Sequence, residues 1–316
     1  MKWIAPSYYP TFHCIADQCV HNCCIGWEID IDTEKLAYYE TVEGKLGERL
    51  CCGIETKGET PHFRLGEGER CPFLNQSGLC DLILELGEES LCQVCRDHPR
   101  FRSFFSDRTE IGVGLCCEAA CDLILSWQAK VILLQLEEDG EREELEPPDA
   151  SLLAWREELF AAAQDRSRPT AERAATILEM AEITLPKKSR AEWAEVYLGL
   201  ERLEETWTTR LKVWQETDLT EAPTLDTPEW EVAWEQLLVY FLYRHLTGAL
   251  EDGEYEGRAA FAVLSFMVIR QLCQAEGVQK GRISLQEGKE IVRAYSAEIE
   301  YSDENVEALL DCILSA

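Results

Sequence analysis

The C-terminal half of the chain repeats apolar residues every three or four positions, which is the period of helices with one buried side. A Ser-x-x-Glu capping sequence at 189–192 predicts the start of a long helix through Trp207, and a second lies at 284–287. Thr227-Pro228 predicts another start, because proline fits the first turn of a helix. Residues 261–273 are apolar on nearly all sides, so we expect the central helix of a bundle there.

The first half of the chain has shorter periodic segments. Residues 27–32 alternate apolar and acidic side chains, which is the pattern of a half-buried strand. Asp32 then stands where it can cap a helix through Tyr39. Residues 81–86 and 88–95 predict two short helices, separated by a glycine.

An apolar segment followed by an acidic one separates the two halves. Residues 123–136 predict an apolar helix, and the proline-stopped acidic run at 137–149 predicts a domain boundary. We therefore expect a Cys-rich domain at 1–121, an apolar helix and acidic linker at 122–150, and a helical bundle at 151–316. The expected fold class is mainly α, with a few short strands in the Cys-rich domain.

Thirteen of the fifteen cysteines lie between Cys14 and Cys121, and such clustering indicates cross-links or metal chemistry. The chain begins without an apolar signal segment, and no apolar run is long enough to span a membrane. We therefore expect a cytoplasmic protein, in which disulfides are rare and clustered cysteines hold a metal. Disulfides or reactive thiols are the alternative.

Zinc and an iron–sulfur cluster both suit thiolate ligands. Structural zinc sites prefer two Cys-x2-Cys pairs, and only Cys92-x2-Cys95 has that spacing here, one helical turn apart. The adjacent Cys23 and Cys24 suit a larger cluster, or two centres on either side of the chain. The adjacent cysteines and the missing second pair favour an iron–sulfur cluster, although the spacings match no ferredoxin pattern, and zinc stays open.

The cysteine motifs follow one another in a distinctive order. The first runs from Phe12 to Asp32 as Phe-x-Cys-x4-Cys-x3-Cys-Cys-x-Gly-Trp-x-Ile-x-Ile-Asp. The later ones are Cys71-Pro72-Phe73-Leu74, Leu79-Cys80-Asp81, Gly87-Glu88-Glu89, Cys95-Arg96-x2-Pro99-Arg100 and Leu115-Cys116-Cys117. This series resembles the bacterial flagellin lysine-N-methylase family across nearly the whole Cys-rich half. The helical half agrees only loosely, around 234–244 and 258–270.

The resemblance implies a 4Fe–4S cluster, S-adenosylmethionine as methyl donor, and lysines of flagellin or another surface protein as substrate. The cysteines that match the family's motifs are Cys14, Cys19, Cys23, Cys24, Cys71, Cys80, Cys95 and Cys117. A 4Fe–4S cluster takes up to four thiolates, so eight cysteines make two centres, or one centre with structural thiols. We expect the unmatched cysteines to be buried apolar residues: Cys51, Cys52, Cys92, Cys116 and Cys121.

Three residues near Cys95 are candidates for the reaction itself. Where the family is expected to have an aromatic residue this chain has His98, so a base role there would pass to a histidine. Arg96 and Arg100 are candidates for binding the carboxylate of the methyl donor, and local ion pairing is the alternative. The chain has neither a glycine-rich nucleotide-binding turn nor the Cys-x3-Cys-x2-Cys spacing of radical enzymes. We therefore expect the donor to bind at an open cluster iron.

The formal net charge of −30 limits the partners. Nucleic acid and anionic membranes need basic patches, so neither is an expected partner. An acidic surface attracts cationic partners, lysine side chains among them, although it also serves solubility alone. The alternative function is a metal-chelating or cluster-carrying protein that performs no methyl transfer.

Overall fold

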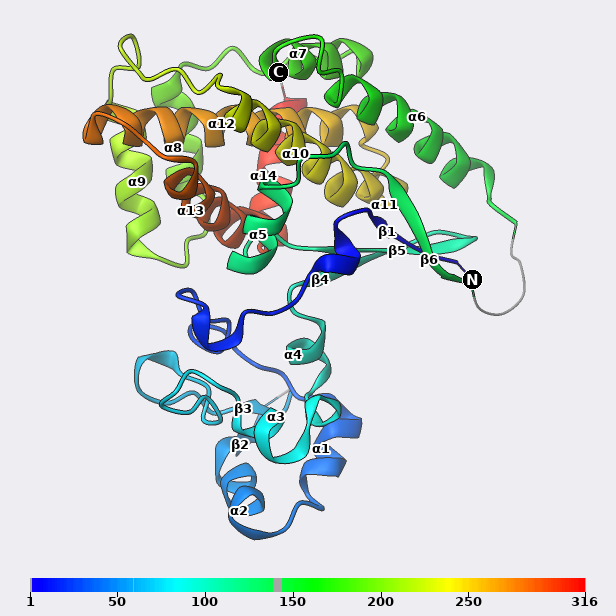
Figure 1. Cartoon of the computed structure of the whole chain (residues 1–316), viewed down its shortest axis with the longest axis vertical. Helices are drawn as coiled ribbons and strands as arrows, with labels where there is room; N and C mark the ends of the chain where they lie inside the picture. Colours follow the sequence, from blue (N-terminus) through cyan, green and yellow to red (C-terminus); the bar gives the residue numbers. More distant parts are fainter. Residues whose placement is uncertain (1, 59, 139–143, 316) are drawn as a thin grey trace. The chain divides into compact units, whose positions relative to one another are not determined.

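The computed structural model describes residues 2–58, 60–138 and 144–315. The chain folds into two compact units (Figure 1). The helical unit comprises 1–12, 102–116 and 120–316, and the cysteine unit comprises 13–101 and 117–119. The structure thus divides the chain at other places than residues 121 and 150, because the first strand and the segment 102–116 belong to the helical unit. The middle of the predicted acidic boundary, 139–143, lies outside the described residues.

The cysteine unit is built from short elements joined by turns (Figure 1). Its α-helices are α1 (Thr33–Tyr39), α2 (Gly44–Gly53), α3 (Asp81–Leu86) and α4 (Gln93–Asp97). The strands β2 (Ile54–Glu55) and β3 (His62–Phe63) form an antiparallel pair. Single 3-10 turns lie at Ala16–Gln18, Glu67–Glu69 and Glu88–Ser90. The helix predicted at 81–86 is confirmed in α3, whereas the segment predicted as a helix at 88–95 forms a 3-10 turn at Glu88–Ser90 and then α4.

Aromatic side chains and one carboxylate organise this unit. The ring of Phe63 packs edge-on against that of Phe73, with centroids 5.0 Å apart. Asp32 caps α1 as predicted, since its Oδ1 accepts from the Lys35 N–H at 3.0 Å. Its Oδ2 accepts from the Gln93 N–H at 2.8 Å, which joins the starts of α1 and α4.

The strand predicted at 27–32 does not form. Ile29 and Ile31 are buried, as the alternation requires, but only an isolated bridge from Asp30 to His62 is present. Neighbouring backbone bonds run from Ile31 N–H to Pro61 and from Phe63 N–H to Ile29. The alternation therefore predicts burial correctly. The facing segment, which contains β3, is too short to form a ladder of hydrogen bonds with residues 27–32.

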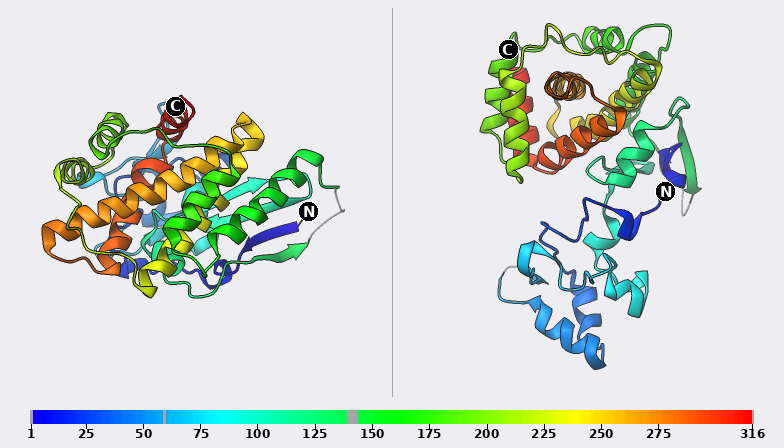
Figure 2. Two further views of the ribbon diagram at one scale, coloured as in Figure 1. Left: turned by 90° about the horizontal axis from the view of Figure 1, so that it is seen from above. Right: turned by 60° about the vertical axis from the view of Figure 1, so that its left-hand side comes forward.

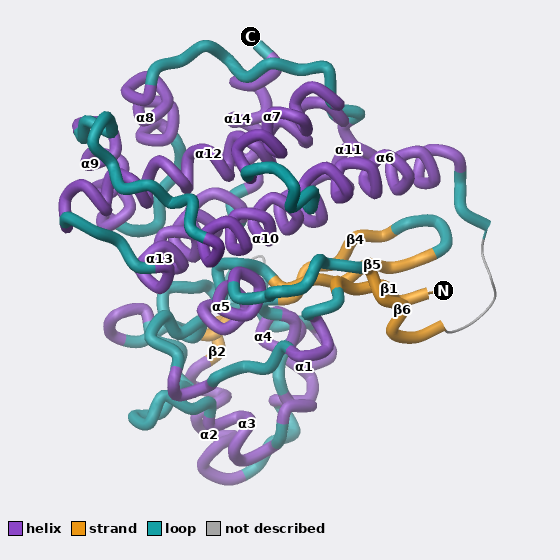
Figure 3. The backbone as a smooth tube through the Cα atoms, turned by 45° about the horizontal axis from the view of Figure 1, so that its top comes forward, coloured by secondary structure: helices purple, strands orange, loops and turns teal. Residues whose placement is uncertain are grey.

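The helical unit contains a four-stranded sheet in the order β4-β5-β1-β6. Its strands are β1 (Lys2–Pro6), β4 (Arg100–Phe104), β5 (Arg108–Val113) and β6 (Leu133–Glu138). β1 pairs parallel with β5 and antiparallel with β6. Figure 3 shows α6 and α10 lying along this sheet.

The prediction of a helix at 123–136 is correct for its first residues only. α5 (Glu118–Leu125) ends early, and β6 follows it. A short apolar run of this kind suits a helix or a strand equally, and pairing with β1 decides for the strand.

Helices make up the rest of the unit (Figure 2). They are α6 (Pro147–Ala163), α7 (Thr170–Met180), α8 (Arg190–Gly199), α9 (Glu205–Glu216), α10 (Pro228–His245), α11 (Ala249–Asp252), α12 (Tyr255–Lys280), α13 (Leu285–Tyr295) and α14 (Asp303–Leu314). A 3-10 turn at Leu246–Gly248 follows α10, and a π-helical turn at Ser296–Glu300 follows α13. The protein is mainly α, as predicted. Both predicted capping boxes are present, and Ser302 caps α14. The helix expected to reach Trp207 instead ends at Gly199, and α9 is separate.

α12 is the central helix of the bundle. By length and composition it is apolar enough to cross a membrane, but 67% of its most apolar stretch is buried inside the structure. Its apolar surface is therefore satisfied by packing against other helices. Cys273 lies on this helix and is fully buried.

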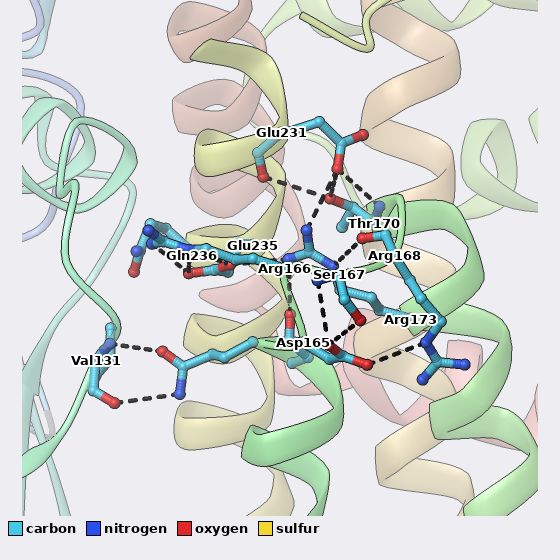
Figure 4. A network of polar contacts seen from close by, with 12 residues as sticks. Val131, Asp165, Arg166, Ser167, Arg168, Thr170, Arg173, Glu231, Glu235 and Gln236 are labelled. Carbon is cyan, nitrogen blue, oxygen red and sulfur yellow. Dashed lines mark hydrogen bonds and ion pairs between the residues drawn. The ribbon is translucent and has the colours of Figure 1, made fainter. Parts of the chain in front are cut away.

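Buried ion pairs tie the helices to their neighbours. Arg156 of α6 makes two bonds of 2.7 Å to Glu110 of β5, and both side chains are buried. The buried carboxylate of Glu235 on α10 binds the guanidinium groups of Arg166, which lies between α6 and α7, and of Arg173 on α7 (Figure 4). Near the end of α10, His245 is buried and contacts Glu300 at 2.8 Å.

Candidate functional site

Five thiols meet in the core of the cysteine unit. Cys71 and Cys92 belong to its buried cluster, beside Phe63, Phe73 and Leu82. The remaining three thiols pack against the same cluster. These core thiols are Cys24, Cys71, Cys80, Cys92 and Cys95. Only Cys92 among them lies outside the family-like motifs, so the structure brings four predicted metal ligands together and adds a fifth cysteine.

Local backbone structure places each core thiol. The Cys71 N–H donates to the carbonyl of Cys24 at 2.9 Å, which holds two distant segments side by side. Cys80 stands at the cap of α3 and bridges to Leu74. Cys92 caps α4 and Cys95 lies one turn later, while Asp32 holds that turn through Gln93. The spacing of Cys92 and Cys95 is the sequence signal for this pair.

The core thiols are electrostatically close to one another. Burial, with the neighbouring thiol of Cys80, raises the pKa of Cys71 to about 11. A hydrogen bond donated to Cys92, together with burial and other nearby thiols, raises the pKa of Cys95. Burial also raises the pKa of Cys80. These three thiols are therefore protonated at neutral pH, and a cation bound among them would replace their protons.

Three more thiols, the loop thiols Cys19, Cys23 and Cys117, adjoin the core thiols, because Cys23 accepts a side-chain hydrogen bond from Cys24. Burial, followed by the nearby carboxylate of Glu118 and the thiols of Cys117 and Cys23, raises the pKa of Cys19 to about 12. Oε2 of Glu118 accepts from the Cys19 thiol at 3.5 Å, from the Val20 N–H at 2.8 Å and from the His21 N–H at 3.2 Å. Glu118 therefore fastens the first cysteine loop beside Cys117.

The other cysteines stand apart from both groups. Cys14 is exposed, and its sulfur accepts from the Ala16 N–H at 3.4 Å. The prediction that Cys51 and Cys52 are buried is wrong, because α2 buries Leu46 and Leu50 and turns both thiols to solvent. Burial is confirmed for Cys116 and Cys121.

The three residues predicted near Cys95 lie on and just after α4. His98 is half-buried against the ring of Trp27, at 6.0 Å between centroids. Burial, with a smaller effect of Arg100, lowers the pKa of His98 to about 4, so the imidazole is neutral at pH 7. Arg96 is exposed, and Arg100 donates to the Arg96 carbonyl at 3.4 Å. Arg96 and Arg100 therefore lie within one short segment.

The thiols suit a metal by their chemistry rather than by a finished geometry. In the part of the chain that the structure describes, no three His, Cys, Asp or Glu side chains are arranged to hold a metal ion. No cysteine is in a disulfide, and the core thiols come from four separate chain segments. A soft donor set of this kind fits zinc or an iron–sulfur cluster, and not a hard cation such as magnesium.

Comparison with known proteins places the C-terminal part of the chain. The family model of the FliB lysine N-methylase C-terminal domain matches residues 186–315, which run from just before α8 to the end of α14. This is the half in which the sequence motifs agreed only loosely. No solved structure matches the chain.

Relatives are found among proteins of Salmonella. The flagellar biosynthetic protein FliU of Salmonella muenchen is 22% identical over 127 residues, covering 38% of this chain and 75% of that protein. A lysine-N-methylase of Salmonella typhimurium is 22% identical over 127 residues, and one of Salmonella choleraesuis is 24% identical over 129 residues. Each of these two alignments covers 38% of this chain and 32% of the methylase. Residues 186–315 are thus similar to the C-terminal domain of FliB-type lysine N-methylases.

Proposed function

We propose that this protein transfers methyl groups from S-adenosylmethionine to lysine side chains of flagellin, or of a similar surface protein, in the cytoplasm. The match of residues 186–315 to the lysine N-methylase domain carries this proposal. The formal net charge of −30 supports it, because an acidic surface attracts a lysine-bearing partner. The sequence motifs of the cysteine unit agree with the same family.

The core thiols would hold the metal of this enzyme, a 4Fe–4S cluster or, as the alternative, zinc. Their gathering in one core from separate segments supports this assignment. A cluster with one open iron would supply a binding point for the amino and carboxylate groups of the methyl donor. A cluster with one open iron takes three thiolates, so the five core thiols are sufficient in number.

Residues of α4 and the turn after it would then act on donor and substrate. Arg96 and Arg100 would bind a carboxylate by charge-assisted hydrogen bonds. A lysine is nucleophilic only after it loses a proton, and a dry site lowers its pKa. His98 is neutral at pH 7 and is the candidate to accept that proton.

Methyl transfer is tested directly with anaerobically purified protein, unmethylated flagellin and S-adenosylmethionine. Mass spectrometry of flagellin peptides is expected to find methylated lysines that depend on both enzyme and donor. Cys71→Ser should abolish the product, whereas Cys52→Ser, at an exposed thiol outside both groups, should leave it unchanged. If metal-replete protein forms no methyl-lysine, the methylase proposal fails and a metal-carrying role replaces it.

A further inference from the structure

A cavity of about 410 Å³ lies in the helical unit, where the segment between α6 and α7 meets the start of α10. Its volume is in the range of pockets that bind small molecules. Three arginines are among the residues that line it, namely Arg166, Arg168 and Arg173 (Figure 4). The chain has 60 acidic residues and 30 basic ones, so three arginines around one cavity stand out from its composition.

Each of these arginines keeps one nitrogen out of the hydrogen bonds formed by the described residues. Arg166 donates through Nε and Nη2 to Glu235 and leaves Nη1 unused. Arg168 donates through Nε and Nη1 and leaves Nη2 unused. The side chain of Arg173 is only 4% exposed, yet its Nη2 lies 3.6 Å from Glu231, which is too far for a hydrogen bond. Ion pairing alone explains the arginines, but not the cavity with unused donors beside it.

Three carboxylates line the same cavity and balance the formal charge of the three arginines. Both oxygens of Glu235 are occupied by arginines. Oε2 of Glu231 accepts from the N–H of Thr170 at 2.8 Å and from its hydroxyl at 2.6 Å, whereas Oε1 accepts nothing from the described part of the chain. Asp226 pairs with Arg270 through Oδ1 only. The unused capacity is therefore of both kinds, donors on the arginines and acceptors on two carboxylates.

We propose that this cavity binds a small zwitterion that carries the carboxylate and ammonium groups of an α-amino acid. The unused guanidinium N–H groups would donate to the carboxylate, and Oε1 of Glu231 would accept from the ammonium. A ligand with no net charge suits the balanced lining, whereas a dianion would have to displace a carboxylate of the protein. The proposal does not depend on the proposed function, since the whole lining belongs to the helical unit.

The ends of two helices favour the same ligand. Pro169 precedes α7 and Pro228 opens α10, and both residues line the cavity. The N-terminal end of a helix carries a partial positive charge, which attracts a carboxylate. Because Glu231 already accepts from the first N–H of α7, the helix ends contribute their field and the arginines contribute the contacts.

Binding of methionine to the full chain, purified anaerobically, is measured by isothermal titration calorimetry. Two matched probes each lack one charge: methioninamide has no carboxylate, and 4-(methylthio)butanoate has no ammonium. Methionine is expected to bind, and each analogue should bind about tenfold more weakly, because each loses a hydrogen bond between charged groups.

Variants assign the contacts to residues. Arg168→Gln, at a side chain that is 39% exposed, should weaken methionine binding about tenfold. Glu231→Gln keeps an oxygen acceptor for Thr170, and it should weaken the binding of methionine but not that of 4-(methylthio)butanoate. Arg282→Gln makes the same change of charge at an exposed residue outside the lining, and it should match wild type. Circular dichroism verifies that each variant is folded.

S-adenosylhomocysteine, which carries the same amino-acid group on a nucleoside, separates two sources of the ligand. Tighter binding than methionine, with the same loss in Arg168→Gln, identifies an S-adenosyl compound, and weaker binding identifies a free amino acid. The proposal is overturned if wild type binds neither compound, or if folded Arg168→Gln and Glu231→Gln bind methionine as wild type does. Binding that Cys71→Ser abolishes and Arg168→Gln preserves would assign the ligand to the core thiols, which overturns the cavity and supports the proposed function.

Discussion

At the scale of single residues, the buried ion pair of Arg156 and Glu110 contributes to the stability of the folded protein. Arg156 lies among the rings of Phe105, Phe160 and Tyr243, with its guanidinium 5.4 Å from the centroid of Tyr243. The carboxylate of Glu110 balances the charge of Arg156 through two hydrogen bonds of 2.7 Å. Removing one partner leaves the other charge buried without compensation.

Glu110→Gln is therefore expected to lower the free energy of unfolding by about 3–5 kcal/mol. Urea unfolding followed by tryptophan fluorescence measures this effect, because all tryptophans except Trp27 lie in the helical unit. The matched control is Asp165→Asn, which breaks an ion pair with Arg168 whose side chains are 40% and 39% exposed. That change should have a much smaller effect, because solvent screens an exposed ion pair. Equal effects of the two variants would contradict the account.

The capping box of α13 makes a pH-dependent contribution. Backbone and side-chain hydrogen bonds from Ser284, and then Lys280, lower the pKa of Glu287 to about 2. Because the pKa is lower in the folded chain, the contribution is fully present above the ordinary value near 4.5 and is lost as the pH falls towards 2.

Glu287→Gln should therefore be less stable than wild type at pH 7, and the difference should shrink as the pH falls below about 4.5. Chemical unfolding at a series of pH values measures it. Glu304→Gln, in the first turn of α14, is a control at another helix start. A difference that stays constant down to pH 3 would show that Glu287 does not act through its charge.

Predicting single cysteines from the sequence succeeds where spacing carries information. Cys92-x2-Cys95 forms a one-turn pair as its spacing indicates, although Cys92 lies outside the family-like motif. Cys51 and Cys52 have no such signal, and which side of α2 faces the core depends on Phe63 and Phe73, residues distant in sequence. Motif matching alone therefore assigns the thiols incompletely.

Helices that begin with a capping sequence are predicted well from the sequence. Strands that depend on pairing with a segment distant in sequence are not. The boxes at Ser189 and Ser284 fix the starts of α8 and α13, because each is a local set of hydrogen bonds. The segment that becomes β6 is apolar and fits either state until β1 pairs with it. The same holds at residues 27–32, where burial follows the pattern and pairing does not.

Close contact between helices requires glycine at one position of α13. A Cβ added at Gly288 would clash with the ring of Trp230 on α10, whose Cζ3 would lie at 2.8 Å. Trp230 is itself stacked on Trp234 at 5.0 Å, so the ring has little room to yield.

Gly288→Ala is expected to lower the free energy of unfolding by about 1–3 kcal/mol through overpacking. The control is Gly199→Ala in α8, where nothing lies within 4 Å of the added Cβ. That variant should be neutral or slightly more stable, since alanine favours helix. Thermal unfolding compares the two. A destabilised Gly199→Ala together with an unchanged Gly288→Ala would refute the packing argument.

At the scale of the whole molecule, each of the two units carries a different indication of function. The cysteine unit carries the motifs that resemble the methylase family, and the helical unit carries the matched C-terminal domain. The sequence locates these two parts but not their boundaries, because strands from both ends of the Cys-rich segment belong to the helical unit's sheet. A strand that pairs with segments distant in sequence has no local sequence pattern that shows which unit it belongs to.

The central claim is that a thiol-held metal centre binds the methyl donor in a lysine methylase. The most direct measurement is iron, sulfide and zinc analysis of anaerobically purified wild type, with absorption and electron paramagnetic resonance spectra before and after S-adenosylmethionine is added. The account predicts about four iron and four sulfide per chain and a spectrum that changes with the donor. Zinc alone without sulfide, or a cluster whose spectrum ignores the donor, would contradict it.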